Sequence, residues 1–180
     1  ALVVIFQEEL RRFFEQLAIW GTRQIKRSKE ATRPTIIKEI LSAVGQMAHD
    51  KIGALIVIQG HDPLTKFVSG GRMLDGMISE ELLLSIFDPT SIGHDGALIV
   101  NGNRVTLFGG HLPLSTDFAQ IGKRGTRHSA ALGLSEVSDA FIIVSSEERG
   151  EVSYVYQGKL TTLMSAEGMS KPLENFLTDV

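Results

Sequence analysis

The chain has 180 residues, of which 43% are hydrophobic, and this length and composition fit one compact domain with an ordinary core. Its net charge is −3 and its 18 lysine and arginine residues are scattered, so the charge pattern of a nucleic-acid-binding protein is missing. The sequence contains no cysteine, which excludes disulfides, cysteine-ligated zinc and thiol catalysis and suits a reducing, cytoplasmic environment.

Residues 1–32 differ in character from the rest of the chain. They begin with an apolar run, Ala1–Phe6, which is too short to span a bilayer. An apolar stripe at helical spacing predicts a helix over residues 7–18 and consists of Leu10, Phe13, Phe14 and Leu17. The apolar run is interpreted either as a packing turn or cloning boundary, or as the end of a membrane helix that precedes the chain. We place a boundary between residues 32 and 33.

The elements of one globular unit follow this boundary. Pro34 suits the first turn of a helix, and apolar residues then recur at helical spacing up to Asp50. Ile52–Ile58 is almost continuously apolar, which is typical of a strand covered on both faces. The glycines of Ser69-Gly70-Gly71 predict a loop, and Glu80–Phe87 is predicted to be a short helix.

Two hairpins are predicted in the second half of the chain. The first joins Ala97–Val100 to Arg104–Phe108 through Asn101-Gly102, a pair that supplies the positive φ angles of a tight turn. The second has its turn at Gln157-Gly158 and joins the strands Val152–Tyr156 and Lys159–Leu163.

Between the hairpins the sequence predicts two helices and a strand. Ser115 is expected to cap a helix over Asp117–Ile121, Thr126 is expected to cap one that runs to Leu134, and Phe141–Val144 is a buried strand. Strands that alternate with helices and hairpins predict an α/β (α+β) fold, in which a mixed central β-sheet is flanked by helices.

One candidate site is Asp95-Gly96-Ala97, which follows His94 and enters a predicted strand. A carboxylate at this place can bind a divalent ion, and an ion-bound sugar hydroxyl loses its proton more readily than a free one. The bare glycine backbone would let a sugar come close. The alternative is a loop aspartate that accepts hydrogen bonds from its own backbone.

A second candidate site is Gly125-Thr126-Arg127-His128. It places backbone N–H groups, a hydroxyl, a guanidinium and an imidazole at one helix start, which suits a polyphosphate. The alternative is a capped helix with a surface arginine.

A third candidate site is Ser146-Glu147-Glu148, at the carboxyl end of a predicted buried strand. Ligands of α/β sheets commonly gather at such strand ends. The alternative is a charged turn between two strands.

In this order the three motifs resemble the diadenylate cyclase (DAC) domain family, which condenses two ATP molecules into cyclic di-AMP. The resemblance extends from about Phe6 to Leu163. Within the family, the chain resembles the membrane-anchored members. It implies a DAC-domain fold for residues 33–180, after an N-terminal juncture that follows a membrane region. It therefore implies a place at the cytoplasmic face of a bacterial cell membrane.

The resemblance also assigns roles to single residues. It implies catalytic roles for Asp95, Gly96, Ala97, Arg127 and His128. It implies ATP contacts by Asp95, Gly96, Leu112, Gly125, Thr126, Arg127, Ser146, Glu147 and Glu148, with Leu112 against adenine. Asp95 and Glu148 would hold a divalent metal ion, Mg²⁺ or Mn²⁺. Two protomers would meet face to face as a homodimer with one ATP each. No regulatory protein partner is identified.

The sequence departs from the family at one position. The family signature is Arg-His-Arg, whereas this chain has Arg127-His128-Ser129, so Ser129 is not assigned to the phosphates. This departure motivates an alternative, a module that senses ATP or cyclic di-AMP without making it. A serine hydrolase using Ser129, His128 and Asp95 is a weaker alternative, because adjacent helix residues point in different directions.

Overall fold

The computed structural model describes residues 33–180, within which Ile36–Val180 form one compact unit. The helix predicted over residues 7–18 lies outside the described residues, and the boundary between residues 32 and 33 stays a prediction.

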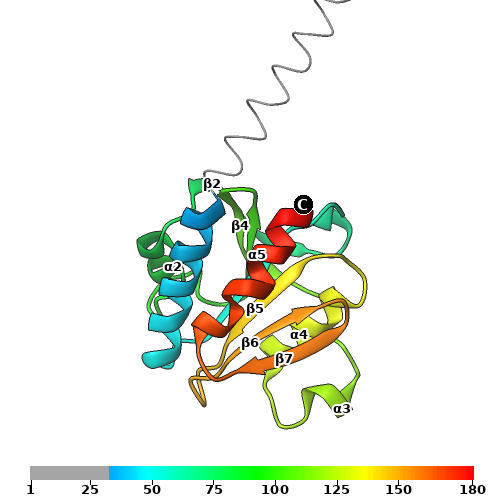
Figure 1. The fold of residues 1–180 in the computed structure, drawn as a ribbon. Coiled ribbons are helices and arrows are strands. Elements are labelled where there is room, and N and C mark those ends of the chain that lie inside the picture. Colours follow the sequence, from blue (N-terminus) through cyan, green and yellow to red (C-terminus); the bar gives the residue numbers. More distant parts are fainter. Residues whose placement is uncertain (1–32) are drawn as a thin grey trace, which may run out of the picture. The chain divides into compact units, whose positions relative to one another are not determined.

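The unit is built on one seven-stranded mixed sheet with the strand order β2-β4-β3-β1-β5-β6-β7 (Figure 1). The strands are β1 (Ala54–Ile58), β2 (Ser69–Met77), β3 (Ala97–Asn101), β4 (Arg104–His111), β5 (Phe141–Ser145), β6 (Val152–Tyr156) and β7 (Lys159–Leu163). β1 and β3 are parallel, whereas all other neighbours in the sheet are antiparallel. This confirms the predicted mixed sheet.

Helices cover both faces of this sheet, so there are two cores. The helix over residues 33–49 packs with α2 (Glu80–Phe87) and α5 (Ser170–Asp179) on one face, and α4 (Thr126–Ser135) lies on the other with α3 (Phe118–Ile121) (Figure 1). Two short 3₁₀ turns, η1 (Leu64–Lys66) and η2 (Ala166–Met169), complete the elements. In β1, Ile56 faces the first core and Val57 the second, which confirms the predicted strand with two covered faces.

Three local predictions were wrong. Ser69-Gly70-Gly71 is not a loop but the start of β2, an edge strand in which Gly70 (φ +67°) and Gly71 (φ +81°) adopt left-handed backbone angles opposite the end of β4. The first hairpin turns at Gly102–Asn103 rather than Asn101-Gly102, because Asn101 still pairs with Arg104. The second hairpin does turn at Gln157-Gly158, and both residues have positive φ angles.

The predicted helix caps were the third error. Gly125, not Thr126, is the N-cap of α4. α3 begins at Phe118, and the carboxylate of Asp117 caps it by accepting the N–H of Gln120. Ser115 instead accepts the N–H of Asp117 and donates its hydroxyl to Glu136.

Candidate functional site

The ends of three adjacent strands bring the predicted motifs to one edge of the sheet. Ala54, the first residue of β1, lies opposite Ser145, the last residue of β5. On its other side β1 runs parallel to β3, with Ile56 opposite Leu98, so β3 also begins at this edge. Asp95-Gly96-Ala97 and the residues after Ser145 are therefore two strand spacings apart, about 10 Å along the edge.

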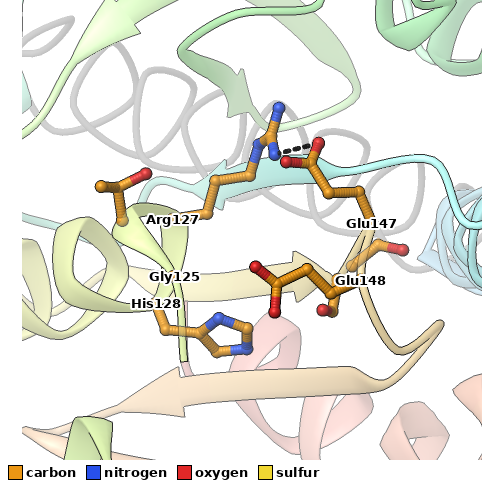
Figure 2. A pocket seen from close by; sticks show the side chains of 8 residues that line it. Gly125, Arg127, His128, Glu147 and Glu148 are labelled. Carbon is orange, nitrogen blue, oxygen red and sulfur yellow. Dashed lines mark hydrogen bonds and ion pairs between the residues drawn. The ribbon is translucent and has the colours of Figure 1, made fainter. Parts of the chain in front are cut away.

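A pocket of about 260 Å³ lies at this edge, between the start of α4 and the end of β5 (Figure 2). It is lined by Gly125, Thr126, Arg127, His128, Ser145, Ser146, Glu147 and Glu148. The structure thus brings together the second and third predicted motifs. Asp95-Gly96-Ala97 and Leu112 do not line the pocket, and Leu112 packs against the core that contains α4.

The floor of the pocket is fixed by hydrogen bonds of the serines at the end of β5. The buried hydroxyl of Ser145 donates to the carbonyl of Ile52 at 2.9 Å, which ties β5 to the segment before β1. Ser146 donates its backbone N–H to Glu151, and its carbonyl accepts the N–H of Gly150, so the turn after β5 is closed. Glu147 and Glu148 therefore lie on a short turn that these hydrogen bonds hold in place.

The start of α4 is open to an anion. In the described part of the chain no side chain caps this helix, whose N-cap Gly125 has an extended backbone. Uncapped N–H groups and the positive end of the helix dipole favour a phosphate or carboxylate at such a place.

Arg127 and Glu147 form an ion pair across the mouth of the pocket, with 2.8 Å between Nη1 and Oε2 (Figure 2). The Arg127 side chain is 21% exposed and that of Glu147 is 60% exposed, so the guanidinium is the more enclosed partner. Figure 2 shows that Glu148 extends from the turn after β5 toward the start of α4. Within residues 33–180, Glu148 makes no ion pair, so its carboxylate is available to a ligand.

His128 is neutral in this site. It is 3% exposed, and its Nε2 atom is buried without a hydrogen-bond partner among the described residues. Burial is the main cause that lowers its pKa to about 4, and the nearby guanidinium groups of Arg124, Arg149 and Arg127 lower it further. The imidazole therefore offers a hydrogen bond rather than a positive charge at neutral pH.

This depressed pKa predicts an acid-sensitive fold. The unfolded chain binds a proton at His128 below about pH 6.5, whereas the folded chain resists it until about pH 4, so stability falls as the pH drops between these values. The loss from this one group is at most about 3 kcal/mol. Urea unfolding between pH 4 and pH 7 measures this loss of stability. His128→Gln should flatten the pH dependence. An equal slope for the wild type and this variant would contradict the assignment.

Asp95 is exposed at the start of β3 and is not a loop aspartate bonded to its own backbone. Among the described residues its carboxylate accepts no hydrogen bond, whereas Asp88 in the same connection accepts one from the N–H of Thr90 at 2.8 Å. Gly96 has φ +100°, and a Cβ there would lie 2.7 Å from the backbone carbon of Gly109. Close packing against β4 therefore requires this glycine, a reason that the sequence analysis did not foresee.

Ser129, which replaces the family arginine, faces away from the pocket. Its hydroxyl donates to the carbonyl of Ser115 at 2.9 Å, and its own carbonyl accepts the N–H of Ser115. One turn later, a Cβ on Gly133 would lie 2.7 Å from the Ser115 nitrogen. The segment before α3 thus packs closely along α4, and a small hydrogen-bonding residue fits at position 129. This arrangement gives no support to a nucleophilic Ser129.

Sequence reasoning missed Gly53, Arg124 and Arg149, which lie near the pocket-lining side chains. A glycine directly before an apolar strand was the visible signal for Gly53.

Within residues 33–180, no group of three or more histidine, aspartate and glutamate side chains is gathered closely enough to hold a metal ion. No helix in the same range is both long and apolar enough to cross a membrane.

Comparison with known proteins shows the family to which this chain belongs. The family model described as "DisA bacterial checkpoint controller nucleotide-binding", or DAC, matches residues 41–160. The chain belongs to this family.

Three relatives illustrate the similarity. The cyclic di-AMP synthase CdaA of Bacillus subtilis is 39% identical over 97% of the chain, which spans 64% of that protein's length. A double-mutant crystal structure of DacA from Staphylococcus aureus has 39% identity and a TM-score of 0.76, with 80% of this chain and 96% of that one covered. The structure of a hypothetical membrane spanning protein from Bacillus cereus has 31% identity and a TM-score of 0.69, with 89% of this chain and 79% of that one covered.

Proposed function

We propose that this domain is a diadenylate cyclase, which condenses two ATP molecules into cyclic di-AMP and releases two pyrophosphates. One observation carries the proposal: a DAC-family chain has a pocket in which an open helix start and Arg127 face the carboxylates at the end of β5. The name of the relative CdaA, a cyclic di-AMP synthase, supports the same activity.

The triphosphate would bind at the start of α4. Backbone N–H groups there and the guanidinium of Arg127 suit phosphate oxygens, since charge-assisted hydrogen bonds are the strong ones. Arg127 would exchange its contact with Glu147 for one with the nucleotide. Arg124 and Arg149 add positive potential, and neutral His128 can hydrogen-bond to a phosphate or ribose without adding charge.

A divalent ion, Mg²⁺ or Mn²⁺, fits the donor set, because Asp95 and Glu148 offer the carboxylate oxygens that such ions prefer. The described residues supply too few donors to hold it alone, so the ion would arrive with the nucleotide and take the remaining ligands from its phosphates. When bound, it would neutralise phosphate charge and acidify the ribose hydroxyl. The role of the chain itself is to hold these two carboxylates on the same sheet edge as Arg127.

The reaction requires two nucleotides that face each other. Each 3′-oxygen attacks the α-phosphorus of the other ATP, loses its proton, and displaces pyrophosphate, so two P–O bonds form and two break. One protomer binds one ATP in this proposal, and a two-fold homodimer supplies the second. The protein contributes chiefly orientation and charge neutralisation.

We also propose that this domain lies at the cytoplasmic face of the bacterial membrane, with an anchor outside the described residues. The description of the Bacillus cereus neighbour as a hypothetical membrane spanning protein is in line with this proposal. The alternative function is a nucleotide sensor, and the two differ in one observable, the formation of cyclic di-AMP from ATP.

Mixed dimers test the face-to-face arrangement. Wild-type protein mixed with an excess of Asp95→Asn should lose more activity than dilution explains, because only one of the two bonds forms readily in a mixed pair. A linear dinucleotide that keeps a triphosphate should accumulate. The measurement is product analysis after subunit exchange, which is verified separately.

The control for this mixing experiment is an inert monomeric protein at the same concentration. Activity in simple proportion to the amount of wild-type protomer, with exchange verified, would mean that each protomer acts alone.

A further inference from the structure

Gly53 lies directly before β1, under the ion pair at the mouth of the pocket. It is buried, and a Cβ built on it would collide with Nη1 of Arg127 and lie 2.6 Å from Cζ of Arg127 and 2.8 Å from Oε2 of Glu147. Real Cβ atoms do not approach other heavy atoms this closely. The guanidinium and the carboxylate therefore occupy the space that any other residue would fill with its side chain.

The need for glycine here is spatial rather than conformational. Gly53 is not among the glycines with a positive φ angle, so its backbone is one that an alanine adopts without strain. The atoms it would meet belong to the ends of two long side chains rather than to backbone. An added methyl group would accordingly displace Arg127 and Glu147 and leave β1 in place.

We propose that Gly53 is a positioning residue for Arg127: its missing side chain leaves the space in which the guanidinium lies beside Glu147 at the edge of the pocket. This proposal rests on the proposed function in one respect, namely that Arg127 contacts the triphosphate. A displacement of about 1 Å in a positioning group is enough to change binding and rate strongly.

The molecule offers a matched control at the other end of the same strand. Gly60 follows β1, also lacks a positive φ angle, and a Cβ there would lie 2.5 Å from Oδ1 of Asp139. Asp139 accepts the N–H groups of His61 and Asp62 and does not line the pocket. Gly60→Ala thus adds the same methyl group against another side-chain carboxylate, away from Arg127.

The test compares the binding of ATP and AMP by calorimetry. Gly53→Ala should raise the dissociation constant of ATP about tenfold and that of AMP less than about threefold, because the triphosphate depends on Arg127. Gly60→Ala should change neither. In an Arg127→Ala background, Gly53→Ala should have no further effect on ATP binding, as expected for two residues that act as one unit. Unchanged ATP binding in a folded Gly53→Ala protein, or equal losses for ATP and AMP, would overturn the proposal.

A second measurement is independent of nucleotide chemistry. If the added methyl group collides with the guanidinium, Gly53→Ala should lower the thermal unfolding midpoint of the wild type more than that of Arg127→Ala. An equal decrease in both backgrounds would overturn the positioning role. Failure of the proposed function appears differently, as wild-type protein that binds ATP no more tightly than AMP and forms no cyclic product.

Discussion

Asp95→Asn should abolish the synthesis of cyclic di-AMP while ATP still binds. The amide keeps the shape of the carboxylate at the start of β3 but loses the charge that would hold a divalent ion near the ribose hydroxyl. Because the Asp95 side chain is exposed and accepts no hydrogen bond among residues 33–180, the substitution breaks no contact that stabilises the fold. We expect a loss of at least about a hundredfold in turnover. Product analysis and nucleotide binding measured on the same preparation separate the two effects.

Asp88→Asn is the matched control, since Asp88 lies in the same connection before β3 but its carboxylate accepts hydrogen bonds from Thr90. It should keep full turnover. Unchanged turnover in Asp95→Asn would remove Asp95 from the catalytic assignment. Loss of ATP binding together with turnover would mean that the ion is needed for affinity as well.

Arg127→Ala should weaken ATP binding more than tenfold and AMP binding much less. A charge-assisted hydrogen bond contributes roughly 1.5–3 kcal/mol, and in the proposed function the guanidinium binds the phosphates that AMP lacks. The substitution also leaves Glu147 without its partner, which adds a negative charge beside the incoming triphosphate. Titration calorimetry with ATP, ADP and AMP measures the three dissociation constants.

Arg104→Ala is the control for the loss of a surface ion pair. Arg104 pairs with Asp75 between β4 and β2, far from the pocket in the strand order. It should leave all three affinities unchanged. Equal weakening of ATP and AMP by Arg127→Ala would show that Arg127 supports the fold of the site rather than the phosphates.

The predicted elements that the structure confirms are those whose signal is local. Apolar periodicity identified the helix over residues 33–49, and the continuous apolar runs identified β1 and β5. α5 was not predicted, although Leu173 and Phe176 lie at helical spacing. α5 is stabilised by packing. The ring of Phe176 lies at a centroid distance of 5.5 Å from the ring of Phe141, which is far away in the sequence. Contacts of this kind are not visible in a local pattern.

The candidate site likewise combines features with a local sequence signal and features that depend on packing. Motif order identified the residues of the α4 start and of the turn after β5, and the pocket contains both. The pairing of Arg127 with Glu147 could not be predicted, because each residue alone fits a solvated surface. The neutral state of His128 depends mainly on burial, and of the three arginines that lower its pKa further only Arg149 is distant in the sequence. Tertiary packing alone reveals such features.

Incubation of this chain with ATP and either Mg²⁺ or Mn²⁺, with products resolved by mass, tests the central claim most directly. The account predicts cyclic di-AMP, formed from two ATP with the release of two pyrophosphates, and its loss in Asp95→Asn. ATP that is bound but recovered unchanged, in protein shown to be folded and dimeric, would contradict the claim and leave a nucleotide sensor.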